Sequence, residues 1–107
     1  MKKKTIIVHH HGEKAKYRYS VSKAENVRVI HMEAIDQEWD EVTEYEIVIA
    51  KLDWYYIAFP DMGTASAAYS AIDDYGTVAD IVHDAGFYNP DTEAITLAIL
   101  DAVKNGF

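Results

Sequence analysis

Polar and hydrophobic residues alternate along the first half of the chain, with the two-residue period of β-strands whose faces meet different surroundings. The alternation is clearest from Ala15, and it predicts that one face of this strand is buried in the core. The residues on that face are Ala15, Tyr17, Tyr19 and Val21. The β-branched residues of 5–8 predict a strand before it, and Gly12 lies in the turn that would join the two as a hairpin.

Further strands are predicted over residues 27–35, 45–52 and 54–59, where β-branched and aromatic residues predominate. The last two form either separate strands or one long strand with a bulge, and periodicity does not distinguish these alternatives. Between them and the third strand, residues 36–44 contain five carboxylates, which repel one another. We expect this acidic segment to be an exposed loop or a short irregular helix.

The pattern becomes helical after Pro60. An alanine-rich stretch over residues 65–75 predicts a first helix that ends at Gly76, and Thr77 would cap a short second helix over residues 77–86. Asn89 and Pro90 supply the N-cap and the first position of a third helix, which ends at Asn105-Gly106.

This order of elements predicts an α+β fold. It consists of a four- or five-stranded antiparallel sheet in the N-terminal half and about three helices from the C-terminal half, packed on one face of the sheet. With 107 residues the chain is long enough to bury one core, so residues 1–107 are expected to form a single domain.

Composition and charge narrow the function classes. The chain has no cysteine, which excludes disulfides, thiolate zinc sites and cysteine nucleophiles. The absence of cysteine fits a cytoplasmic protein. No apolar stretch approaches the ~20 residues that cross a bilayer, so we expect no membrane partner. The net charge of −8 is unevenly distributed: residues 1–23 carry seven positive and one negative side chain, and the remainder is strongly acidic.

The histidines are the first candidates for chemistry. In a strand His9 and His11 point to the same side, roughly 7 Å apart, and with His31 from a neighbouring strand they could form a metal site with an open position for water. His83 lies near Asp80 and could act as a general base, but no nucleophile motif accompanies it. A His-based metal-dependent enzyme or a metal-binding protein is therefore an alternative, while the main prediction requires no cofactor and no catalytic residue.

The basic N-terminal hairpin suggests a second alternative. Lys16 and Arg18 interleave with Tyr17 and Tyr19, and cations beside aromatic rings are the mixture that binds single-stranded nucleic acid. The alternation, however, places the tyrosines on the face opposite the cations, and the acidic domain as a whole would repel a polyanion. Direct nucleic-acid binding is therefore not the favoured interpretation.

The favoured function is a small, acidic, non-enzymatic protein-binding module. Eight tyrosines and two tryptophans exceed the needs of one small core, and such residues are enriched at interfaces. We expect the acidic segment to engage a protein partner with a basic surface, steered by charge and held by aromatic contacts. The predicted partner-binding residues are Glu38, Trp39, Asp40, Glu41, Glu44 and Tyr45.

In size and charge the chain resembles small phage-encoded inhibitors of host defence, including anti-CRISPR proteins and other DNA mimics. The resemblance is one of class and rests on no motif. It implies an inhibitor of a nucleic-acid-binding or host-defence protein, whose acidic face would occupy the place of phosphates. The polarised charge also permits a homodimer, through hairpin and acidic segment or through paired sheet edges.

Overall fold

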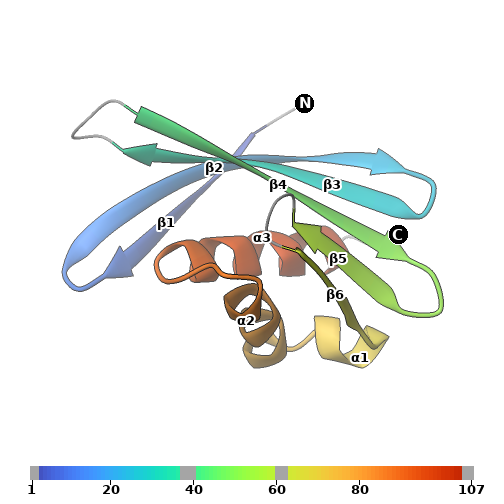
Figure 1. The fold of residues 1–107 in the computed structure, drawn as a ribbon. Helices are drawn as coiled ribbons and strands as arrows, with labels where there is room; N and C mark the ends of the chain where they lie inside the picture. The colour runs from blue at the N-terminus through green and yellow to red at the C-terminus, as the bar shows by residue number, and fades with distance from the viewer. Residues whose placement is uncertain (1–2, 37–40, 60–62, 105–107) are drawn as a thin grey trace.

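The computed structural model describes residues 3–36, 41–59 and 63–104, which form an antiparallel sheet followed by three helices (Figure 1). Each strand pairs with the next one in the chain, so the sheet order is β1-β2-β3-β4-β5-β6. The strands are β1 (Lys4–His10), β2 (Glu13–Ala24), β3 (Val27–Asp36), β4 (Glu41–Lys51), β5 (Tyr55–Phe59) and β6 (Gly63–Ala67). The α+β class is thus confirmed, with six strands.

Two predictions are wrong: the number of strands, which is six rather than four or five, and the structure at the end of the acidic segment. The alanine-rich stretch predicted as the start of a helix forms β6 instead, because Ala65 and Ala67 pair with Ile57 and Tyr55 of β5. Local helix propensity is weak compared with a ladder of backbone hydrogen bonds and a buried apolar neighbour. In addition, β4 begins at Glu41, so the end of the acidic segment is strand rather than loop.

The helices are α1 (Tyr69–Ile72), α2 (Tyr75–Asp84) and α3 (Asp91–Lys104). The N-cap of α2 is Asp74 rather than Thr77, since its carboxylate accepts from the Thr77 backbone N–H at 3.0 Å and from the Thr77 hydroxyl at 2.6 Å. These bonds lower the pKa of Asp74 below its ordinary value, because they favour the ionised form. α1 is a single turn that leads from β6 into α2.

The helices lie together on one side of the sheet in Figure 1, where α3 contacts β1, β2 and β3 and α2 packs on α3. Inward-pointing side chains of alternate strand positions form the core with the apolar side of α3. Tyr17 and Tyr19 are 2% and 4% exposed, which confirms the predicted buried face of β2. Fully buried members of the core are Ile30, Ile47, Ile49, Ile57, Ile95, Ala98 and Ile99.

The other side of the sheet, here called the open face, carries the alternate strand residues. No helix or strand among the described residues lies over it (Figure 1). In the same described ranges, no helix has the length and apolar character needed to cross a membrane. The packing of the core therefore accounts for one face of the sheet and leaves the open face without a covering layer.

Candidate protein-binding surface

The strand registers arrange the open face into rows that run across the sheet. Side chains at directly paired positions point to the same side, so each row brings together residues that are distant in sequence. One row contains Thr5, Arg18, Glu33 and Glu44, and the next contains Ser20, His31 and Glu46. Cations thus come mainly from β1 and β2, and carboxylates from β3 and β4.

A charged band crosses the middle of the open face. Lys3 and Arg18 both approach Glu33, with N–O distances of 3.1 and 3.3 Å, and His31 lies 3.7 Å from Glu46. The hydrogen bond from Lys3 lowers the pKa of Glu33 below its ordinary value, and Arg18 adds to the effect. Glu44 is exposed and forms no ion pair with another described residue, so a carboxylate on β4 remains available.

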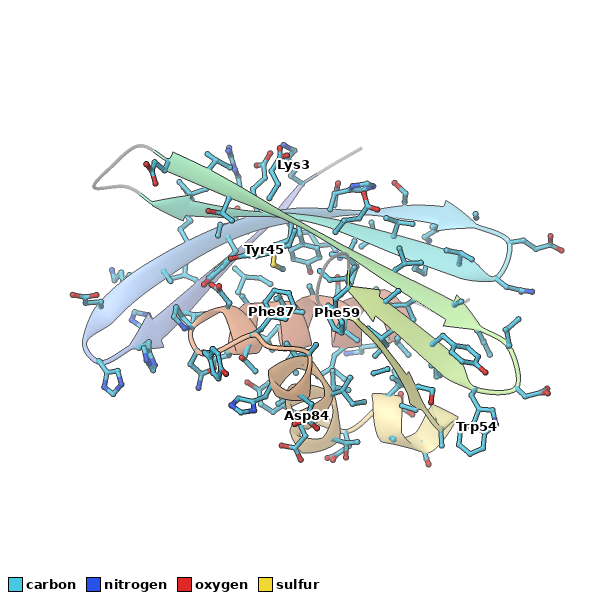
Figure 2. All side chains as sticks on the ribbon, viewed as in Figure 1. Lys3, Tyr45, Trp54, Phe59, Asp84 and Phe87 are labelled. Carbon is cyan, nitrogen blue, oxygen red and sulfur yellow. The ribbon has the colours of Figure 1, made fainter. Side chains whose placement is uncertain are left out.

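An open hollow accompanies this band. Its volume is about 440 Å³, and its walls include Lys3, His31, Glu33, Glu44 and Glu46. Figure 2 shows Lys3 on this side of the sheet, whereas Phe59 and Phe87 lie on the helix side. Met32, Tyr45 and Phe87 also line the hollow, so it combines charged side chains of both signs with apolar and aromatic ones.

Apolar side chains continue from the band toward the β4–β5 turn on the same face. Among them Tyr56 is 41% exposed, and Trp54 and Leu52 in the turn beyond it are 53% and 59% exposed. Figure 2 labels Trp54 at the β4–β5 turn. Large apolar groups exposed next to one another are typical of protein-binding sites. The apolar residues of β3, β4 and β5 on the open face are here called the apolar patch. They are Val27, Val29, Val48, Ala50, Tyr56 and Ala58.

On the covered face, two tyrosines converge on one carboxylate at the start of α3. Tyr17 and Tyr45 donate hydrogen bonds to Asp91 at 2.5 and 2.8 Å, from β2 and β4 respectively. The ring of Tyr45 also meets Phe87 at 5.6 Å between centroids. We call Tyr17, Tyr45 and Asp91 the tyrosine–aspartate clamp, because it ties the helix to the sheet.

A similar contact holds the other end of α3. Asp101 accepts a hydrogen bond from the Tyr19 hydroxyl at 2.8 Å. It also forms an ion pair with Lys4, with an N–O distance of 2.6 Å. Burial, and then the bond to Asp101, raises the pKa of Tyr19 above its ordinary value. The two ends of α3 are therefore attached to β1, β2 and β4 by polar contacts around an apolar centre.

The clamp makes the protein sensitive to high pH. Burial, and then the hydrogen bond to Asp91, raises the pKa of Tyr17 and of Tyr45 above the ordinary value of 10.0. Above pH 10 the unfolded chain loses these protons while the folded chain retains them, so the free energy of unfolding should fall as the pH rises. Urea unfolding from pH 9 to 11 should show this slope, and it should flatten in a Tyr17→Phe, Tyr45→Phe variant.

The predicted partner-binding residues are divided by the fold. Glu38, Trp39 and Asp40 lie outside the described residues. Glu44 is on the open face, and Glu41 is exposed at the start of β4, whereas Tyr45 points to the helices and is bound in the clamp. Alternation along β4 causes this division, since consecutive side chains point to opposite faces.

Other features of the surface were not predicted from the sequence. The apolar patch and Glu46 belong to strands that are hydrophobic on both faces, as in Val27–Ile30 and Ile47–Ala50. A strand that is apolar on both faces is typical of a sheet that is covered on both faces. This pattern in the sequence could therefore have predicted a binding surface on the second face. Asp91 follows Pro90 at the start of α3, and nothing in the local sequence links it to the two tyrosines.

The structure does not bring the three candidate metal ligands together. His31 pairs with Ser20, which lies beyond the last β1–β2 pair at Lys4, while His9 pairs with Lys14 near the opposite end of β1. About six residues, roughly 20 Å of strand, thus separate His9 from the level of His31. Within the described ranges, no group of three or more His, Asp or Glu side chains is arranged to hold a metal ion.

His83, the candidate general base, lies on the exposed side of α2. Its ring meets that of Tyr88 at 5.1 Å between centroids, in an edge-on arrangement. The neighbouring Asp84 is exposed (Figure 2). The geometry here is that of a surface aromatic contact.

Comparisons with known proteins complete the description of this surface. A scan against protein-family models, a search of curated proteins and a search of solved structures each find no match. Function must therefore be argued from the site.

Proposed function

We propose that this chain is a non-enzymatic protein-binding module that engages a partner through the open face of its sheet. The observation that carries the proposal is the apolar patch on a sheet face over which no described element packs. Half-buried valines and an exposed tyrosine on a rigid sheet provide a preorganised contact area, which lowers the entropic cost of association.

The charges beside the patch favour a basic partner. Glu46 lies in the row next to Val29 and Val48, Glu44 lies one row further along, and both glutamate side chains are exposed. Carboxylates at the rim attract lysine and arginine side chains and accelerate encounter, while the apolar patch supplies the contact energy. The net charge of −8 adds a long-range attraction to any cationic surface.

An inhibitory role follows if the partner binds nucleic acid. Cationic side chains that hold phosphates would then bind Glu44 and Glu46, and the partner would lose its access to DNA or RNA. In this form the module acts as a competitor for a phosphate-binding surface in the cytoplasm.

Binding of nucleic acid by the chain itself is less well supported. Lys16 and Arg18 lie on the open face, but Tyr17 and Tyr19 are buried beneath the sheet with their hydroxyls bound to Asp91 and Asp101. Single-stranded binding needs aromatic faces beside the cations, and here the two are on opposite sides.

A capture experiment tests the proposal. The wild-type protein, immobilised and incubated with a nuclease-treated bacterial lysate, should retain a stoichiometric basic protein at moderate salt. The double variant Glu44→Lys, Glu46→Lys should lose that protein, because the rim then repels lysine and arginine.

The matched control reverses two exposed carboxylates on the helix side, Asp80→Lys and Asp84→Lys, with the same change in net charge. This control should retain the partner. Equal loss in both variants would mean that net charge alone is responsible. Retention by the Glu44 and Glu46 variant would remove the open face from the binding site.

A further inference from the structure

The strand β1 forms one edge of the sheet, and its outer side pairs with no other described strand. All seven residues of β1 pair in continuous register with β2, without a bulge, and the strand contains no proline or glycine. The other edge strand, β6, has five residues and begins with Gly63. A regular edge with free backbone N–H and C=O groups is a template for another strand.

Lysines usually protect such an edge from association, but the lysines of this edge are neutralised within the chain. Lys3 forms an ion pair with Glu33 at 3.1 Å, and Lys4 forms one with Asp101 at 2.6 Å. The central residues of the edge, Thr5 to Val8, are uncharged and β-branched. The two lysines beside the edge, Lys3 and Lys4, are therefore paired within the chain, the other described cations of the hairpin lie one strand inward on β2, and a strong preference for strand structure remains.

Charge disfavours contact between the helix layers of two copies. Between Leu52 and Val103 the chain contains nine Asp and Glu residues and no Lys or Arg. Two copies would repel each other wherever their helix layers met. Around β1, in contrast, each of two carboxylates is matched by a lysine.

We propose that β1 pairs with β1 of a second copy in an antiparallel arrangement about a two-fold axis perpendicular to the sheet. This inference goes beyond the proposed function and does not depend on it. Because the axis keeps the open face of both copies on the same side, paired residues must point to the same face. The register that pairs all of Lys4–His10 under this condition places Ile7 opposite Ile7 of the second copy, Ile6 opposite Val8, and Thr5 opposite His9.

Apolar side chains on both sides of the sheet fit this arrangement. Ile7 is 55% exposed on the open face, and it would be covered by its own counterpart. On the helix side, Leu97 is 39% exposed and lies one turn before Asp101, whose carboxylate binds Lys4 of β1. Pairing thus adds backbone hydrogen bonds and covers Ile7.

The dimer would contain one continuous sheet with both apolar patches on the same side. A partner with two matching sites would then bind the second patch at a high effective concentration.

A single introduced cysteine tests the register, since the chain has none of its own. Directly opposed residues of antiparallel strands have Cα atoms roughly 4.5–5.5 Å apart, within the range that a disulfide spans. Ile7→Cys should therefore form a covalent dimer on mild oxidation, visible on a non-reducing gel. Its matched control is Thr5→Cys, which is exposed on the same face but roughly 14 Å from its counterpart along the strand.

Sedimentation velocity over a range of concentrations provides the second measurement. The wild-type protein should sediment as a dimer, and Ile7→Lys should weaken association by at least about tenfold, because two lysines would meet at the axis. Val42→Lys, at a residue 52% exposed on the same face, should not weaken it. A wild-type monomer at all concentrations, or cross-linking of Thr5→Cys as complete as that of Ile7→Cys, would overturn the proposal.

Discussion

Replacing Asp91 with alanine should lower the free energy of unfolding by about 3 kcal/mol, because the hydroxyls of Tyr17 and Tyr45 then lose their common acceptor. Tyr17 is 2% exposed, so little of its side chain is hydrated in the folded chain. Urea unfolding followed by far-UV circular dichroism would measure the change. Asp91→Asn, which keeps one carbonyl oxygen as acceptor, should lose less.

A double-mutant comparison isolates the cause. In a Tyr17→Phe, Tyr45→Phe background no hydroxyl needs the carboxylate, and Asp91→Ala should cost less than about 1 kcal/mol there. An equal cost in both backgrounds would mean that Asp91 stabilises the start of α3 in another way, for example through the helix dipole.

The second large effect is expected at Ile47, which is fully buried in the core. Ile47→Ala should lower the free energy of unfolding by about 3 kcal/mol, since it leaves a cavity against the helix layer. Val48 is the next residue of β4 and points to the open face, where it is half-buried. Val48→Ala should cost less than about 1 kcal/mol.

This pair of variants also tests the central assumption about function. The change from Val48 to alanine should weaken capture of the partner while leaving the fold nearly as stable. The assumption that one sheet face is open would fail if Val48→Ala were as destabilising as Ile47→Ala, because the valine would then be covered within the folded chain.

The two proposed interfaces are separable on the molecule. The partner surface uses β3, β4 and β5, whereas self-association uses the outer edge of β1. Glu44→Lys with Glu46→Lys should therefore leave sedimentation unchanged, and Ile7→Lys should leave capture of the partner by each copy intact apart from any gain from bivalency. Each proposal can fail without the other.

Local patterns were sufficient for much of the fold. The two-residue period of 15–21 predicted which face of β2 is buried, since only one register places Tyr17 and Tyr19 inside. Asn89-Pro90 directly precedes α3, which begins at Asp91, so the predicted start of this helix is one residue early, and the predicted end at Asn105-Gly106 lies outside the described residues. The absence of cysteine and the uneven charge are properties of composition and need no structure.

Pairing between distant segments required the tertiary structure. Helix propensity in 65–75 was overridden by the ladder between β5 and β6, and Glu41 entered a strand because it pairs with Asp36 of β3. The clamp joins residues 46 and 74 positions apart. Neither periodicity nor spacing specifies which strand faces a helix terminus, nor which apolar strand face the helices leave uncovered, because both depend on how the layers meet in space.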